Sequence, residues 1–267
     1  MKNLRPALAL VALLGVVAGC SGSGAPSITD PNEVISKSVA AAPAVKSVHV
    51  KVAVTGKINA GALGGLSSAA SALSGNLTLD GTSAEGDVDV ANQAADIKIT
   101  LPSLFGTGEV IVSGGNLYYK LSLTGAKFTK MPLSNSPVSI PSPGTVASAN
   151  PSALASSLGK SLADAGVTAT LLADGNVGGT AAYHVSLSVP VAKINSLLAA
   201  AGGSATAGLA LDSASVDYWV YKDSLLPAQL EVKASAGTFG NLDITATLTN
   251  YNQAVTINAP AASDVSK

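Results

Sequence analysis

The chain has 267 residues, a formal net charge of −1 and only 12% charged residues, whereas 47% of its residues are hydrophobic. A charge so close to neutral creates no field that attracts nucleic acid, so we exclude nucleic acid as a partner. After the N-terminal segment no long uninterrupted apolar stretch follows, which excludes a polytopic membrane protein.

The N-terminal segment has the pattern of an export signal that ends at Cys20, the only cysteine. Lys2 and Arg5 make a positive start, residues 7–18 are apolar, and small residues precede Cys20 as in a cleavage site. The apolar stretch is shorter than the roughly 20 residues of a transmembrane helix. The pattern therefore predicts a bacterial lipoprotein signal over residues 1–19, with an ordinary secretory signal and a chance cysteine as the alternative.

In the lipoprotein pathway the Cys20 thiol receives a diacylglyceryl group and the leader is removed, which leaves residues 20–30 as a lipidated tether. One acyl chain anchors a protein marginally, whereas two or more anchor it stably. We therefore expect the protein at the extracytoplasmic face of the cell membrane, anchored through Cys20. A lipidated Cys20 leaves no thiol for a disulfide, so packing must stabilise the single remaining domain, residues 31–267.

The first predicted element of this domain is a helix over residues 31–42. Asp30 stands at the N-cap position and Pro31 at the first helical position. Glu33 stands at the third helical position, as in a capping box, and Pro43 ends the helix.

Most of the chain that follows has the pattern of β-strands. Residues 48–54 alternate valines with other residues, the period of a strand with one buried face. Similar alternation predicts strands over residues 76–80, 87–90, 96–101, 110–113, 117–123, 167–172, 183–189, 216–221, 230–232, 242–248 and 255–257. Turn formers such as Gly114-Gly115 and residues 174–176 separate them. Short connections favour an antiparallel meander over parallel βαβ units.

Two more helices are predicted, each with one apolar face. One follows Pro151 and continues to about Gly166, and the other follows Pro190 and ends at Gly202-Gly203. Such helices must bury their apolar faces against a sheet. The predicted fold class is therefore α+β, a curved antiparallel sheet or half-barrel with helices covering its concave face.

Two segments have no clear pattern. Residues 59–73, rich in Ala, Gly and Ser, predict a weak helix or a mobile flap, and residues 131–151, with five prolines, predict a long loop. Loops of this length inside a compact domain are usually functional or disordered. A tolerated surface insertion is the alternative for both.

The search for catalytic or metal-binding residues gives a negative result. His49 and His184 occupy polar-face positions of predicted strands, and no nucleophile elbow, zinc-protease helix, phosphate-binding loop or dinucleotide fingerprint occurs. Asp87 and Asp89 share the exposed face of one strand, as solvated charges do. We therefore predict that the protein is not an enzyme and uses no metal or cofactor.

The densest aromatic cluster is found at residues 218–221. In a strand, Trp219 points to the opposite face from Tyr218. We interpret the cluster as sheet packing, with a contact to carbohydrate or a lipid headgroup as the alternative.

Several strand and turn segments also match one known family in their order along the chain. The matching stretches are residues 44–50, 56–58, 73–77, 114–119, 216–220, 226–230 and 248–257. In these stretches the chain resembles the mycobacterial lipoprotein family of LppX, LprA, LprF and LprG. The inserts at residues 59–73 and 131–151 depart from the family pattern, which leaves the pocket entrance and the identity of the ligand open.

The resemblance implies a half-barrel sheet wrapped around helices with an apolar cavity between them. It implies a monomer that binds an acylated lipid or glycolipid and carries it across the cell envelope, with an envelope transporter as a further partner. It places Val88 in the cavity wall. Alternation then adds the other residues expected there, which are Val52, Leu77, Leu79, Val90, Ile97, Ile99, Val110, Leu117 and Tyr119.

A different class of protein fits the same alternation. In a surface-tethered structural or protein-interaction module the helices fill the sheet completely and no ligand binds. Because a packed core and a lipid pocket use the same apolar residues, the pattern alone does not separate the two.

Overall fold

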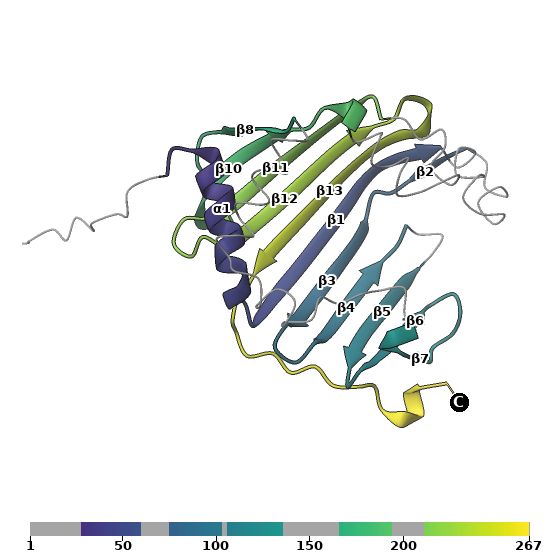
Figure 1. Cartoon of the computed structure of the whole chain (residues 1–267). Helices are drawn as coiled ribbons and strands as arrows, with labels where there is room; N and C mark the ends of the chain where they lie inside the picture. Colours follow the sequence, from purple (N-terminus) through teal and green to yellow (C-terminus); the bar gives the residue numbers. More distant parts are fainter. Residues whose placement is uncertain (1–27, 60–74, 103–105, 136–165, 194–210, 267) are drawn as a thin grey trace, which may run out of the picture.

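The computed structural model describes residues 28–59, 75–102, 106–135, 166–193 and 211–266. The predicted signal, Cys20 and most of the tether lie outside these ranges. Within them the chain forms one long α-helix, α1 (Pro31–Ala41), and an antiparallel sheet of thirteen strands (Figure 1). Short 3-10 helices are η1 (Ala42–Ala44), η4 (Leu133–Asn135), η6 (Gly237–Phe239) and η7 (Ala262–Asp264).

The sheet consists of two consecutive series of strands. The first series is β1 (Ser47–Asn59), β2 (Asn76–Thr78), β3 (Thr82–Asp89), β4 (Ala94–Thr100), β5 (Thr107–Ser113), β6 (Asn116–Leu121) and β7 (Thr129–Pro132). The second series is β8 (Thr168–Leu171), β9 (Gly175–Val177), β10 (Thr180–Ser188), β11 (Ser213–Tyr221), β12 (Pro227–Ser235) and β13 (Gly240–Thr249).

The strand order is β7-β6-β5-β4-β3-β1-β13-β12-β11-β10-β8, with β2 on β1 and β9 on β10. Most neighbours in space are thus neighbours in the chain. The pairs β1–β3 and β8–β10 skip one strand each, and one pair joins the two series: β1 pairs with β13 from His49↔Thr249 to Ile58↔Gly240. The sheet curves but does not close (Figure 1). The predicted curved antiparallel half-barrel is confirmed.

Helix α1 forms as its sequence predicts. The Asp30 side chain accepts a hydrogen bond from the backbone N–H of Asn32 at 2.9 Å, which satisfies one donor of the first turn. The helix gives way to η1, which contains Pro43. Its buried residues are Val34, Ile35 and Ser38, which lie on one side of the helix.

That side of α1 packs on the strands at one end of the sheet. Val34 and Ile35 form a cluster with Tyr183 and Val185 of β10 and Val220 of β11. Two tyrosine hydroxyls add polar contacts to this packing. The Tyr183 hydroxyl accepts from the Ile28 N–H at 3.2 Å, and the Tyr218 hydroxyl bonds the Ser38 hydroxyl at 2.7 Å. We call the face of the sheet that carries α1 the inner face.

The C-terminal segment after β13 lies against the opposite, outer face. Ile257 and Val265 pack against Ile111, Tyr118 and Phe128 there. The Phe128 N–H donates to the Asp264 carbonyl at 2.7 Å, and the Ser266 N–H donates to the Phe128 carbonyl at 2.8 Å. The predicted strand over residues 255–257 is wrong, because both sides of β1 are already paired with β3 and β13 and the segment crosses the face instead.

Two other predictions need correction. Of residues 174–176, predicted as a turn, Gly175 and Asn176 belong to β9, which pairs with β10. The turn between them is made by Gly178 and Gly179, whose φ angles of 58° and 86° favour glycine.

The predicted loop over residues 131–151 begins later than expected. Met131 and Pro132 belong to β7, where they lie opposite Leu117 and Asn116. This strand has only four residues, too few to show a clear alternation. The part of the loop after residue 135 lies outside the described ranges.

The remaining predicted helices fall largely beyond the described residues. The helix over residues 150–166 and the segment 60–73 lie outside them. Of the helix after Pro190, only residues 191–193 are described, and they are helical.

Candidate functional site

The pairing register brings apolar side chains from most strands onto the inner face. One row of residues crosses seven adjacent strands, and each residue in it is paired with the next residue on the neighbouring strand. Its members are Val185, Tyr218, Leu230, Ala246, Val52, Ala84 and Ile99. Every side chain in this row is apolar except for the tyrosine hydroxyl. Because side chains alternate between faces, residues two positions away continue the same surface.

The two ends of this inner surface are packed. At one end α1 covers β8, β10 and β11, as described above. At the other end Ala95, Val112 and Leu117 are buried. The aromatic ring of Tyr119 and the side chain of Met131 pack against that second cluster.

The centre of the inner surface, formed by β12, β13 and β1, is different. Its aliphatic side chains are only partly buried, and Leu230 is 37% exposed. None of the four buried clusters in the described part of the chain includes the residues of this central patch. The patch consists of Leu230, Val232, Ile244, Ala246, Val52 and Val54. We call these six residues the central apolar patch.

The predicted lining residues fall into two groups. Seven lie at inner-face positions of strands, namely Val52, Val88, Ile97, Ile99, Val110, Leu117 and Tyr119. Leu77 of β2 lies opposite Ile58 of β1. Leu79 and Val90 follow strands rather than lie in them, and their N–H groups donate to the carbonyls of Gly56 and Lys46. The role of all ten as ligand contacts stays a prediction.

Five of the six residues of the central apolar patch were absent from that predicted set. Val54 and the apolar positions of residues 230–232 and 242–248 alternate as clearly as Val52 does. What the alternation does not show is that β13 lies beside β1, which requires pairing between residues almost two hundred positions apart. Only that pairing places Ile244 and Ala246 next to Val54 and Val52.

A polar pair marks the border between the covered end and the central patch. Ser38 of α1 is fully buried, and its hydroxyl lies 2.7 Å from that of Tyr218, which itself lies opposite Leu230. Burial raises the pKa of the Tyr218 hydroxyl, while the bond to Ser38 acts in the opposite direction. This pair gives the fully buried Ser38 hydroxyl and the partly buried Tyr218 hydroxyl a partner next to the apolar surface.

Both histidines lie on the outer face, as their strand positions predict. His49 contacts Asp87 at 2.8 Å and Glu85 at 3.4 Å, and the Lys51 ammonium lowers the pKa of Glu85. His184 lies in a separate place, 3.0 Å from Asp217. Across the described ranges, histidine, cysteine and carboxylate side chains form no group suited to a metal ion.

The tryptophan of the aromatic cluster also lies on the outer face. The rings of Trp219 and His184 stack with centroids 4.2 Å apart and planes 12° apart. A Cβ on Gly175 would lie 3.2 Å from Trp219 Nε1, so the strand β9 passes close to the indole. Trp219 and Tyr218 thus point to opposite faces, and the observed contacts of Trp219 are packing contacts within the sheet.

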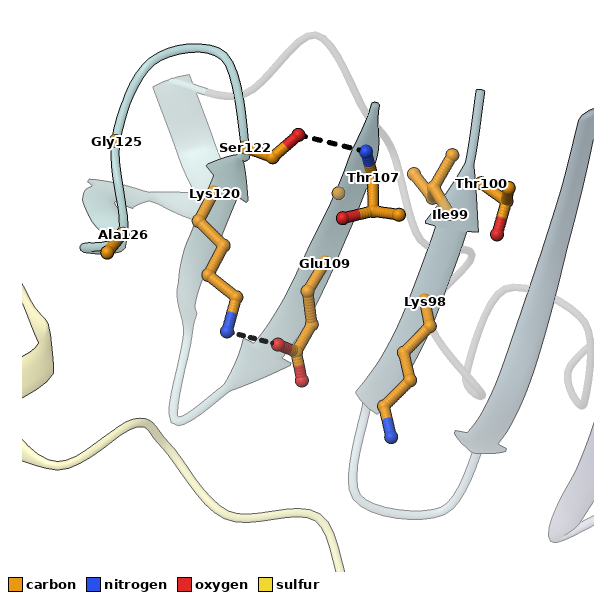
Figure 2. A pocket seen from close by; sticks show the side chains of 10 residues that line it. Lys98, Ile99, Thr100, Thr107, Glu109, Lys120, Ser122, Gly125 and Ala126 are labelled. Carbon is orange, nitrogen blue, oxygen red and sulfur yellow. Dashed lines mark hydrogen bonds and ion pairs between the residues drawn. The ribbon is translucent and has the colours of Figure 1, made fainter. Parts of the chain in front are cut away.

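The outer face carries open pockets with polar walls. One, of about 390 Å³, lies between His49, Asp87, Asp96 and Thr256. Burial raises the pKa of Asp96, with a smaller contribution from Glu109, and its buried Oδ1 has no hydrogen-bond partner. Another, of about 540 Å³, lies at the ends of β4, β5 and β6 (Figure 2). Charged and hydroxyl side chains contribute to the walls of both pockets, together with apolar atoms.

The described chain contains no helix that is long and apolar enough to span a membrane. The described part of the chain defines a class of fold, an open antiparallel half-barrel with a mostly apolar inner face. Comparison with known families then identifies the group within this class.

The model of the family described as LppX_LprAFG lipoprotein matches residues 30–257. The chain belongs to this family. Comparison with curated proteins gives no match.

Two solved structures share the fold. The lipoprotein LppX from Mycobacterium tuberculosis has a TM-score of 0.50 and 17% identity, over 85% of this chain and 97% of that one. LprF from Mycobacterium bovis has a TM-score of 0.50 and 20% identity, over 87% of this chain and 97% of that one. The predicted family and the predicted half-barrel are therefore confirmed.

Proposed function

We propose that this chain is a lipid carrier of the cell envelope. Anchored through an acylated Cys20 at the extracytoplasmic face of the cell membrane, it binds an acylated lipid or glycolipid on its inner face as a monomer. It passes the lipid on across the envelope, with a transporter as its donor or acceptor. This makes it a binding protein and not an enzyme.

The observation that carries the proposal is the partial exposure of the central apolar patch. Aliphatic side chains at the middle of a sheet normally contribute most to a core, yet here Leu230 is 37% exposed. Contiguous exposed apolar surface marks sites that bind lipid, small molecules or protein partners. The valine, isoleucine and alanine side chains of the patch provide no directional polar contact, so they suit an alkyl chain.

The energetics of an alkyl ligand match a carrier that uses no fuel. Moving an acyl chain of about sixteen carbons out of water is worth about 13 kcal/mol at about 0.8 kcal/mol per CH₂. Loss of such a ligand into water is therefore very slow. Exchange with a bilayer is close to balance, because the chain moves from one hydrocarbon environment to another.

The test is extraction of lipid from the purified chain. We would express residues 20–267, which contain every described residue, with Cys20→Ser so that no anchor lipid is attached. Organic extraction and mass spectrometry should recover about one lipid per protein. A folded protein without bound lipid, unable to take up lipid from vesicles, would contradict the proposal and favour the interaction module.

A pair of variants locates the ligand. Ala246→Phe places a large side chain in the central patch, beside Val52 and Leu230, and should reduce the bound lipid several-fold. Thr247→Phe makes the same change one residue away, on the outer face, and should bind lipid as the parent does. Equal lipid content in both variants would place the ligand elsewhere.

A further inference from the structure

The C-terminal segment, residues 250–266, crosses the outer face and is tied down at its two ends (yellow in Figure 1). At its start, the Asn252 N–H donates to the Ser47 carbonyl of β1 at 2.9 Å. At its other end, two backbone hydrogen bonds join it to Phe128, as described above. We call this segment the C-terminal strap.

The middle of the strap is held in a different way. Residues 254–260 form no hydrogen bond with the rest of the described chain. Val255 and Ile257 are half-buried, whereas the residues directly beside them are exposed. Ile257 packs against the apolar cluster that contains Ile111 of β5. Packing of apolar side chains is therefore the contact that holds the middle of the strap on the sheet.

A carboxylate lies beside this apolar packing. Asp96 of β4 is paired with Ile111 across β4 and β5, and it lines the same pocket of about 390 Å³ as Thr256 and Ile257 of the strap. Asp96 Oδ1 is buried and has no hydrogen-bond partner among the described residues. A buried charged oxygen without a partner costs free energy. The ionised carboxylate therefore opposes the packing of Ile257 next to it.

The charges around Asp96 favour its neutral form. The titratable side chains on this part of the outer face are His49 and Lys51 of β1, Glu85, Asp87 and Asp89 of β3, Lys98 of β4, Glu109 of β5, Lys120 of β6 and Asp264 of the strap. Asp87 is directly paired with Asp96 across β3 and β4. Burial raises the pKa of the Asp96 carboxyl, Glu109 and Asp87 raise it further, and the neighbouring lysines act in the opposite direction. Residues 252–260 of the strap contain no titratable side chain that could compensate.

We propose that Asp96 and the C-terminal strap form a pH-sensitive latch on the outer face. In acid the Asp96 carboxyl is neutral, carries one O–H donor for the carboxylate of Asp87 opposite, and lets Ile257 pack beside it. The docked strap therefore favours the protonated form. As the pH rises from the ordinary pKa of an aspartate through the raised pKa of Asp96, this stabilisation is lost and the strap is released more often.

Release of the strap uncovers the apolar cluster around Phe128, because Ile257 and Val265 are the strap residues that pack against it. The latch lies on the face opposite the central apolar patch. It therefore does not depend on the proposed carrier function.

Hydrogen exchange measured by NMR tests the latch in the chain from residue 20 with Cys20→Ser. The N–H groups of Phe128 and Ser266 report on the docked strap, since each donates across the contact between them. Their protection, corrected for the intrinsic exchange rate at each pH, should fall between about pH 3 and about pH 7. We expect a decrease of up to about fivefold, the factor for about 1 kcal/mol.

Three variants separate the latch from general effects of pH. Asp96→Asn should keep the protection of Phe128 and Ser266 at the parent's acid value throughout. Asp243→Asn changes an aspartate near the start of β13, whereas the strap begins after the end of this strand, and it should follow the parent. Ile257→Ala should lower the protection at every pH, because it removes packing of the strap.

Protection that stays constant with pH in the parent would overturn the latch, as would an equal change with pH in Asp96→Asn. Unchanged protection in Ile257→Ala would also overturn it, because other contacts would then hold the strap. The extracted lipid content, which tests the carrier, is measured separately and should be the same in all three variants.

Discussion

The covered end and the centre of the inner face contain the same kinds of residue but differ in burial. Val185 of β10, under α1, is completely buried, whereas Val52 of β1, in the same row of the sheet, is partly exposed. Among the described residues, α1 packs over Val185, whereas none of the buried clusters includes Val52. Alternation makes an apolar face, and a packed element above it decides whether that face is a core or a binding surface.

The largest expected change in the free energy of unfolding comes from replacing a valine by alanine, once at the covered end and once in the centre of the inner face. Val185→Ala should lower the free energy of unfolding by about 2 kcal/mol, because it leaves a cavity in close-packed surroundings. Val52→Ala should lower it by less than about 1 kcal/mol, because the side chain is already partly exposed. Urea unfolding of the lipid-free chain measures both, and equal losses would mean that the centre is packed as tightly as the covered end.

Breaking the hydrogen bond between the Ser38 and Tyr218 hydroxyls should change the free energy of unfolding by a smaller amount. Ser38→Ala leaves the partly buried Tyr218 hydroxyl without its Ser38 partner and should lower the free energy of unfolding by about 1–2 kcal/mol. Adding Tyr218→Phe removes the unpaired hydroxyl. The double variant should therefore be more stable than additive losses predict, as a double-mutant cycle in urea would show. Additive losses would mean that the two hydroxyls do not interact.

The smallest expected change in stability concerns Asp96 on the outer face of the sheet, which carries more polar side chains than the inner face. Burial raises the pKa of Asp96, so between its unfolded and folded pKa values the folded chain binds more protons. Stability due to Asp96 is therefore lost as the pH rises through this window, and the full penalty remains at neutral pH.

Asp96→Asn should remove that penalty. We expect a gain of less than about 1 kcal/mol at pH 7, since the carboxyl is partly exposed and solvent screens its interactions. The gain should vanish at a pH below the ordinary pKa of an aspartate. Thermal unfolding of both chains across pH measures it, and a loss of stability at pH 7 would show that the Asp96 carboxylate makes a favourable contact.

Local signals in the sequence were enough to predict much of the fold. Asp30 and Pro31 identified the start of α1, and the Gly114-Gly115 turn between β5 and β6 was predicted from residue type, because positive φ angles favour glycine. The misplaced turn at residues 174–176 shows the limit. Gly175 suits a turn by composition, but pairing with β10 makes it part of a strand.

The sequence by itself determined the apolar and polar faces of the strands, the capped helix and the family, because each depends on residues close together in the chain or on their order. Only the tertiary structure decided that β1 and β13 meet at the centre and that α1 covers one end of the inner face. These contacts join distant residues, and their free energy comes from burial that no local pattern contains. For that reason the strand alternation predicted an apolar surface, and only the fold located the part of it that is partly exposed.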